Sequence, residues 1–430
     1  MVGQTRTDSV SICPNTPLEH QKSRIDCNSV TMLLALPLEF SVKCCFWVCF
    51  MTNIKVQIGW GRTPRDIQVP KSSRIIEPRR TNEAVLSQGR LLDAIESPIG
   101  MPGLSELAQA AEKICILIPD ESRKPIPDFI LPMILSRLSG RNVSVGIASG
   151  KHPVVEAPSG QWRHDASSPS LVAAGTTSRG TVVEFPKRVL QADLRILIGE
   201  IRPHYFAGYA GGAKTLFPGV AGEKGIWHNH KLKASPFAAL GKVDGNPCRE
   251  DMENAARFAG PSFIVNIIRN HVGVPVDVVA GDIVDAHRAG VEIARPHFEV
   301  SLQSRSSVVL VSDKAPVTNN LYQACKLLPV AARLLLDGGT IILCAACEDG
   351  LGPIDIINEA IYRLGMVPIL PSNHRVVLVS SQPAERVEQS FASYGSSVEA
   401  VLAEMEATDP LILPYAGELV PVLSESNATP

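Results

Sequence analysis

Short runs of β-branched and aliphatic residues alternate with amphipathic stretches along most of the chain. Continuous apolar runs of this length are typical of parallel strands buried on both faces of a sheet. They predict strands over residues 114–118, 143–147, 194–198, 307–311, 340–343 and 375–379. Helical periodicity predicts helices between them, among others over 127–138, 320–336, 354–364 and 384–404. This alternation predicts the α/β class with largely parallel sheets.

The first fifty residues differ from the rest of the chain. Pro37, Glu39 and Lys43 interrupt their apolar stretch, so no run reaches the roughly 20 residues that a membrane span needs. The order of charged and apolar regions that marks a signal peptide is also missing. Met51 then precedes an alternating strand. We therefore expect residues 1–50 to be a non-native or disordered extension.

From Met51 onward, the alternating strand and helix patterns predict two Rossmann-like α/β domains. We expect the active site in the cleft between them. The first covers residues 51–296 and the second 297–407, because the sequence between 276 and 300 has the composition of a boundary. Residues 408–430 form a tail. A length of 430 residues suits two domains or three at most.

Composition and charge exclude several classes of protein. With 41 Lys and Arg against 43 Asp and Glu, the net charge of −2 gives no electrostatic footprint for nucleic acid or an anionic membrane. Five of the ten cysteines lie in the first fifty residues, and the others are scattered apart from a Cys344–Cys347 pair that reads as buried apolar residues. No disulfide framework emerges, so we expect a reducing compartment, the cytoplasm.

Polar side chains follow the predicted strands at the point where each one ends. Asp120 and Arg123 follow the first strand, His152 the second and His204 the third. Parallel strands present their carboxyl ends at one edge of a sheet, where open α/β folds bind ligands. The sequence therefore predicts a site at this edge.

The densest candidate segment runs from Arg202 to Gly219. Gly208, Gly211 and Gly212 allow the backbone to approach a ligand closely. The spacing from Gly208 to Lys214 is that of a phosphate-binding loop, but Ala213 replaces its second glycine and disfavours that interpretation. Lys214 is either an exposed loop cation or, if desolvated, a nucleophile that anchors a cofactor covalently.

Two histidines follow at a spacing of two. His228 and His230 can share one side of a strand and bind a transition metal, or they can be unrelated. One alternative function is therefore a zinc-dependent hydrolase with the metal on His204, His228 and His230. Another is a non-catalytic α/β protein that binds a mononucleotide.

The segment from His204 to His230 resembles the nickel-pincer-dependent lactate racemase family, the LarA-like 2-hydroxyacid racemases and epimerases. The matching pattern comprises His204, Ala207, Gly208, Gly211, Gly212, Lys214, Pro218, Gly219, Asn229 and His230. Further motifs match in the family's order, namely Asp120 to Arg123, Gly150 to His152, His164–Asp165 and Asn320 to Lys326. Roughly residues 51–420 are covered, and the family's pattern suggests that the tail returns to the first domain.

The resemblance implies a role for each matching residue. His152 and His204 correspond to the paired acid–base histidines, and Arg123, Gln323 and Lys326 to residues around the substrate. Lys214 corresponds to the lysine that anchors the nickel-pincer nucleotide through a thioamide bond, in the domain of residues 51–296. Other cofactor-binding positions are Asp120, Tyr322, Gly211 and Gly212. His230 corresponds to the metal ligand.

The implied reaction inverts C2 of lactate or a related 2-hydroxy acid by proton abstraction and reversible hydride transfer to the nickel-pincer nucleotide. Two faces of one carbon need two bases, which suits a pair of imidazoles. The implied partners are a small-molecule substrate and cofactor-biosynthesis proteins, with no nucleic acid and no membrane.

Three positions depart from the family's pattern. Pro153 follows the Gly-x-His histidine where the family usually has arginine, Lys124 separates Arg123 from the next proline, and Arg163 precedes His164 in place of asparagine. All three flank the matching residues, so they affect the expected substrate more than the expected reaction.

Overall fold

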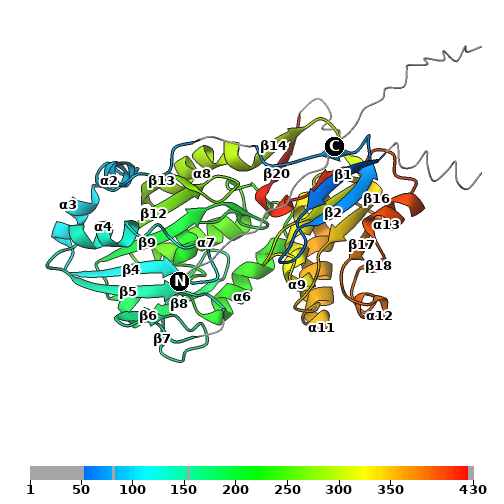
Figure 1. The fold of residues 1–430 in the computed structure, drawn as a ribbon. Helices are drawn as coiled ribbons and strands as arrows, with labels where there is room; N and C mark the ends of the chain where they lie inside the picture. Colours follow the sequence, from blue (N-terminus) through cyan, green and yellow to red (C-terminus); the bar gives the residue numbers. More distant parts are fainter. Residues whose placement is uncertain (1–52, 80–82, 153–154, 425–430) are drawn as a thin grey trace, which may run out of the picture. The chain divides into compact units, whose positions relative to one another are not determined.

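The protein is described by a computed structural model that covers residues 53–79, 83–152 and 155–424 (Figure 1). The expected extension over residues 1–50 and the departure at Pro153 lie outside the described residues. The described chain contains two six-stranded sheets, each largely or wholly parallel, flanked by helices. The predicted α/β class with largely parallel sheets is confirmed.

The first sheet holds five parallel strands and one antiparallel edge strand, β13. In spatial order its strands are β13 (Pro275–Asp282), β12 (Ser262–Arg269), β9 (Leu194–Ile201), β4 (Lys113–Pro119), β5 (Asn142–Ala148) and β6 (Gln161–Arg163). Successive side chains of a strand point to opposite faces. Ile114 and Ile116 accordingly belong to one apolar cluster and Cys115 and Leu117 to another. Burial of both faces explains the continuous apolar runs.

Helices cover both faces of this sheet. The cluster around Ile116 includes apolar residues of α2 (Gln88–Glu96), α3 (Leu104–Ala110) and α4 (Ile130–Arg137). The opposite cluster includes residues of α5 (Lys187–Leu190), α6 (Glu223–Lys231) and α7 (Pro247–Arg257), while α8 (Asp285–Phe298) packs on β13 and β12. The Asn246 side chain caps α7 by accepting from the N–H groups of Cys248 and Arg249.

The second sheet is wholly parallel. In spatial order its strands are β18 (Ser393–Gly395), β17 (Arg375–Val379), β16 (Leu335–Cys344), β15 (Ser306–Ser312), β19 (Leu411–Leu413) and β3 (Arg74–Ile75). Its helical segments are α9 (Leu321–Ala324), α10 (Leu328–Ala332), α11 (Ile354–Ile356), the π-helix η4 (Ile357–Met366), α12 (Ala384–Val387) and α13 (Val398–Glu404).

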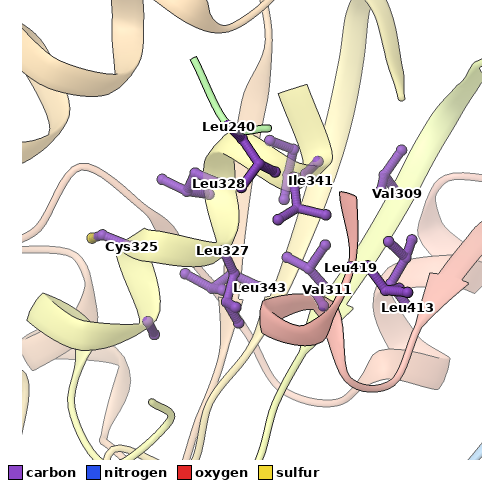
Figure 2. Packing of buried hydrophobic residues seen from close by; sticks show 14 of the residues in the cluster. Leu240, Val309, Val311, Cys325, Leu327, Leu328, Ile341, Leu343, Leu413 and Leu419 are labelled. Carbon is purple, nitrogen blue, oxygen red and sulfur yellow. The ribbon is translucent and has the colours of Figure 1, made fainter. Parts of the chain in front are cut away.

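The two faces of the second sheet bury different partners. One face packs on α9, α10 and Leu240, as Figure 2 shows for Val309, Ile341 and Leu343. The other face packs on α13 and on the hairpin of β1 (Asn53–Ile58) and β2 (Arg65–Pro70). Three short pairs complete the described strands, namely β7 (Leu171–Thr176) with β8 (Val182–Pro186), β10 (Pro203–His204) with β11 (Gly208–Tyr209), and β14 (Glu299–Leu302) with β20 (Val420–Leu423).

The domain boundaries expected at residues 51, 296 and 407 stay a prediction, but the topology adds detail. Strand β3 pairs with β19, so the chain before residue 76 contributes to the second sheet. Within the tail from 408, β19 lies in the second sheet and β20 pairs with β14. The two-domain proposal therefore has to assign both chain ends partly to the second sheet.

Two predicted helices differ in the structure. The helix expected over 384–404 is interrupted, because residues 393–395 form the edge strand β18 beside β17. Ser397 then caps α13 by accepting from the N–H of Ala400. The helix expected over 320–336 breaks at residue 332, and the chain from Leu335 already belongs to β16.

The five described cysteines are free and buried, in agreement with the interpretation of Cys344 and Cys347 as apolar core residues. Burial raises the pKa of the Cys347 thiol to about 12, which keeps it protonated and unreactive. Across the described ranges, none of the helices is long and apolar enough to cross a membrane.

Candidate functional site

The structure brings three predicted polar positions to one sheet edge. Asp120 directly follows β4, His152 lies four residues after β5 and His204 three residues after β9. These strands are neighbours in the order β9, β4, β5 and run parallel, so their carboxyl ends meet. The three residues therefore follow neighbouring strand ends at one sheet edge, as the sequence predicted.

His152 is held by a carboxylate. Its Nδ1 lies 2.5 Å from Oδ2 of Asp120, whose other oxygen accepts from the Ser122 hydroxyl at 2.6 Å. Burial would raise the pKa of Asp120, but the hydrogen bonds from His152 and Ser122 lower it overall. The ionised carboxylate accepts the Nδ1 hydrogen, which leaves the lone pair of the ring on Nε2. His152 is thereby prepared to accept a proton.

His204 has the opposite arrangement. Its Nδ1 accepts from the N–H of Ala207 at 3.2 Å, so the hydrogen of the neutral ring sits on Nε2. Desolvation and the positive charges of Lys214 and Arg249 lower its pKa well below the ordinary value. The two histidines thus face the site in opposite tautomers, one with a lone pair and one with an N–H.

The ring of Phe206 links the groups that follow His204. Its centroid lies 4.6 Å from that of His204 and 5.0 Å from that of His230, both edge to face. Lys214 Nζ lies 5.6 Å from the same centroid. An apolar ring among these three polar side chains keeps them together and partly dry.

Lys214 lies in a 3₁₀ helix, η1 (Gly212–Thr215). Desolvation, together with the charges of Arg249 and Arg123, lowers its pKa from 10.5 to about 7. About half of an amine with this pKa is the free nucleophile at pH 7. Of the two interpretations of Lys214, the structure favours the desolvated nucleophile over the exposed cation.

Gly211 and Gly212 form the turn before Lys214, both with positive φ angles of 79° and 60°. A Cβ at Gly211 would lie 2.6 Å from the side-chain oxygen of Asn266, and one at Gly212 would lie 2.9 Å from the ring of His287. The N–H of Gly212 donates to the same Asn266 oxygen at 2.6 Å. Only glycine therefore fits at either position.

Arg249 holds this turn by hydrogen bonds. Its sequence context did not identify it as a residue of the candidate site. Its guanidinium is fully buried and donates to the carbonyls of Ala207, Tyr209 and Gly211, the last at 3.1 Å. Oε1 of Glu253, one turn along α7, lies 3.9 Å from Nε of Arg249. Nothing in the local sequence distinguishes this arginine from a surface residue of an amphipathic helix.

Two further missed residues hold the same turn. His287 Nε2 lies 2.8 Å from the carbonyl of Ala210, and the side chain of Asn266 accepts from Gly212 as described. Asn266 did carry a signal, because it is the polar residue in the middle of the apolar run Phe263–Ile268. Such a residue in a buried strand needs a partner, and here the partner is the Lys214 turn.

The two histidines of the His-x-His pair do not share a site. The expectation that they lie on a strand is wrong, because both belong to helix α6, where residues two apart differ by about 200° in direction. His228 is exposed and its Nε2 lies 3.0 Å from the carbonyl of Arg179. His230 contacts Phe206 and is the one that faces Lys214.

His230 presents a neutral imidazole. Its Nδ1 is buried without a side-chain partner among the described residues, and the ring interacts with the backbone of Ile226 one turn earlier in α6. Desolvation and the charge of Lys214 lower its pKa to about 3, so the ring is neutral and can donate a lone pair. The neighbouring Asn229 is anchored to Asp251 by a buried hydrogen bond of 2.9 Å, which fixes this end of α6.

The remaining predicted residues bring positive charge. Lys326 donates to the side-chain oxygen of Gln323, and Asn320 caps this helix by accepting from the Gln323 N–H. Desolvation and the charges of Arg123 and Arg202 lower the pKa of Lys326 to about 8. The charges that act on Lys326 therefore come from parts of the chain that are distant in sequence. Tyr322 lies on the same helix and is partly exposed.

The structure does not assemble the ligands of the alternative zinc site. Within the described part of the chain, no group of three or more His, Cys, Asp or Glu side chains is arranged to hold a metal. His228 points to Arg179, away from His204 and His230.

Comparison with known sequences gives a consistent set of relatives. A family model described as "Lactate racemase N-terminal domain" matches residues 60–241. The lactate racemase of Thermoanaerobacterium thermosaccharolyticum is 28% identical over 390 residues, which cover 79% of this chain and 91% of the relative. The lactate racemase of Lactiplantibacillus plantarum is 29% identical over 303 residues, which cover 65% of this chain and 71% of the relative.

Comparison with solved structures agrees. The lactate racemase apoprotein from Thermoanaerobacterium thermosaccharolyticum matches with a TM-score of 0.78 at 25% identity, covering 86% of this chain and all of that chain. A protein from Thermotoga maritima matches with a TM-score of 0.59 at 15% identity, covering 80% of this chain and all of that one. The second likeness shows the fold alone.

Proposed function

Because the chain belongs to the lactate racemase family of LarA-like proteins, we propose that it is an isomerase that interconverts the two configurations at C2 of a 2-hydroxy acid. The observation that carries this proposal is the pair of histidines in opposite tautomers at neighbouring strand ends. Inversion at C2 by hydride transfer needs one group that takes the hydroxyl proton and another that returns a proton to that oxygen when the hydride re-enters on the opposite face. Because these relatives are lactate racemases, we propose lactate or a related acid as the substrate.

Each histidine has a definable task. His152 takes the hydroxyl proton at Nε2, and Asp120 stabilises the positive ring that results, because its carboxylate accepts the Nδ1 hydrogen at 2.5 Å. His204, on the neighbouring strand, returns a proton to the substrate oxygen in its protonated form, because a neutral imidazole is too weak an acid to release its hydrogen. When the opposite enantiomer reacts, His204 starts as the neutral ring that takes the hydroxyl proton and His152 as the protonated ring that returns one.

We further propose that the cofactor is the nickel-pincer nucleotide, attached to Lys214 and with its nickel bound by His230. The chain's residues fit this group, because the Lys214 amine is nucleophilic near neutral pH and the buried His230 ring is neutral and can offer a lone pair. When bound, the group supplies the hydride acceptor that proton transfer alone cannot provide. Gly211 and Gly212 let the backbone approach it closely.

We assign the basic residues to the binding of anionic groups. Arg123 matches a planar carboxylate by bidentate contact, and Lys326 adds a point charge that Gln323 orients by a hydrogen bond. Tyr322 and Asp120 border the cofactor side. Positioning of this kind fixes C2 between the two histidines and supplies much of the rate enhancement.

Two finer proposals concern the cell. The cofactor must be supplied by cofactor-biosynthesis proteins, which we propose as partners of the unloaded chain. We place the protein in the cytoplasm, because its five described thiols are free and buried rather than paired.

The test is co-expression with the enzymes that make the cofactor. We expect intact-mass measurement to find a covalent adduct that Lys214→Ala eliminates, nickel in metal analysis, and interconversion of either enantiomer of a 2-hydroxy acid by chiral chromatography. Zinc without an adduct would favour a hydrolase. An unmodified, metal-free protein with cofactor supply verified would contradict the proposal.

A further inference from the structure

Asp251 is a buried carboxylate of α7 to which the proposed function assigns no task. Its Oδ1 accepts from the Thr177 hydroxyl at 2.5 Å. Its Oδ2 accepts from the Thr181 hydroxyl at 2.7 Å and from the Asn229 side-chain amide at 2.9 Å. All three partners are neutral donors, and all three are themselves buried.

A buried carboxylate carries a large desolvation cost, which hydrogen bonds from several donors offset. These hydrogen bonds therefore compensate for burial more than they add stability. A fully satisfied network does, however, fix one arrangement of the elements that it joins. Three elements meet on Asp251, namely α7 itself, the turn of residues 177–181 between β7 and β8, and α6. The network therefore determines how α6 is placed against α7.

Helix α6 is held through Asn229. The side-chain nitrogen of Asn229 donates both to Asp251 and to the carbonyl of Cys248, the latter at 3.0 Å. In return, Sγ of Cys248 donates to the backbone carbonyl of Asn229 at 3.7 Å. His230 is the next residue along α6, so the direction in which its side chain leaves the helix depends on these contacts.

The same helix α7 holds the turn that carries Lys214. Arg249, two residues before Asp251, donates to the carbonyl of Gly211 at 3.1 Å, and this carbonyl also accepts from the N–H of Lys214 at 3.3 Å. Residues two apart on a helix differ by about 200° in direction, so Arg249 and Asp251 serve opposite sides of α7. Helix α7 thus fixes the Lys214 turn and the His230 end of α6 relative to each other.

We propose that Asp251 is a positioning residue for the metal, because it sets the direction of the His230 imidazole relative to Lys214. This inference rests on the proposed function, in which one group is attached to Lys214 and bound by His230. Attachment at the lysine fixes one end of that group, so a small rotation of α6 would misplace the imidazole at the other end. Loss of a residue that orients a metal ligand typically lowers metal affinity by about 10- to 100-fold.

The test measures nickel per Lys214 adduct, by metal analysis and intact mass, in protein co-expressed with the enzymes that make the cofactor. We expect Asp251→Ala to lower this ratio at least fivefold. Asp251→Asn should restore most of it, because its side-chain oxygen can still accept from Asn229 while its nitrogen donates to the Thr177 hydroxyl. Asn229→Ala breaks the same contact and leaves Asp251 both threonine donors. It should therefore show the same loss even where Asp251→Ala fails to fold.

Asp193→Ala is the matched control. Its carboxylate accepts from the N–H groups of Glu112 and Lys113 at 3.0 and 2.8 Å, at the amino ends of β4 and β9 and thus at the opposite edge of the first sheet. Removing it should lower the urea midpoint of unfolding and leave nickel per adduct within twofold of the original. The urea midpoint of every variant is measured beside its nickel content, which separates a loss of orientation from a loss of stability.

Each outcome decides the inference. Unchanged nickel per adduct in Asp251→Ala and Asn229→Ala overturns the positioning role and leaves the racemase standing. Equal loss of nickel in Asp193→Ala also overturns it, because the loss would then follow stability alone. If the original chain carries an adduct without nickel, or no adduct at all, the proposed cofactor is contradicted and the inference fails with it.

Discussion

Nδ1 of His152 lies 2.5 Å from Oδ2 of Asp120, although 32 residues separate them along the chain. The contact forms because β4 and β5 are parallel neighbours, so residues just beyond their carboxyl ends are brought together. It determines which ring nitrogen of His152 carries the hydrogen, and therefore which one keeps the lone pair of the neutral ring.

Replacement of Asp120 by asparagine should lower kcat about 10²-fold, the order of magnitude of general-base catalysis. The amide can offer its N–H to Nδ1, which would move the ring hydrogen to Nε2 and remove the lone pair that accepts the substrate proton. The measurement is initial rate with the loaded enzyme, and intact mass should show an unchanged adduct. A kcat within threefold of the original would mean that the carboxylate does not orient His152.

Lys214 should react with amine reagents at unusually low pH. Its pKa is lowered from 10.5 to about 7, so the nucleophilic neutral amine forms as the pH rises through 7 and is lost below it. The unloaded protein would be labelled with a limiting amount of reagent at pH 5 to 10, and peptides quantified by mass spectrometry.

We expect the Lys214 rate to be half-maximal near pH 7 after normalisation to the exposed Lys71, which reports the reagent itself. An ordinary lysine reaches half of its maximal rate near pH 10.4. A Lys214 profile with that midpoint would show that the amine is solvated in solution and would weaken its assignment as the anchor.

Arg249 should be important for stability as well as for the site. Arg249→Met removes the donors that the carbonyls of Ala207, Tyr209 and Gly211 share, leaving buried acceptors unsatisfied. We expect the free energy of unfolding to fall by about 3 kcal/mol, measured by urea denaturation of the unloaded protein.

Arg257→Met is the matched control, because Arg257 is an exposed residue on the same helix, α7. It should change the free energy of unfolding by less than about 0.5 kcal/mol. Equal effects of the two substitutions would show that the guanidinium of Arg249 does not hold the turn.

The sheets were predictable because their strands are buried on both faces, which leaves a continuous apolar signal such as Ile114–Ile118. The interrupted helix over 384–404 was not, because a single edge pairing of β18 with β17 outweighs local periodicity. Edge strands of three residues depend on a neighbour that the local sequence does not reveal.

The residues of the candidate site also divide into those that the local sequence indicated and those that it did not. The residues proposed to contact a ligand lie in motifs that follow the strands, which the local sequence displays, as with His152 and Lys214. The groups that hold them come from other elements, so Arg249 and His287 reach the Lys214 turn from α7 and α8 without any local pattern. The spacing of His228 and His230 suggested one shared site, because residues two apart lie on the same face of a strand. In the helix α6 the same spacing directs the two side chains apart.

The two histidines of α6 should therefore differ sharply when replaced. His230→Ala removes the neutral imidazole beside Phe206 and should lower the nickel content of the co-expressed protein at least tenfold while the adduct on Lys214 is still detected. His228→Ala removes only the contact with the Arg179 carbonyl and should leave nickel, adduct and kcat within twofold of the original. Metal analysis and intact mass of the two variants, purified side by side, measure this directly. If His228→Ala also released the metal, both histidines would be ligands and the arrangement of α6 proposed for the racemase would be wrong.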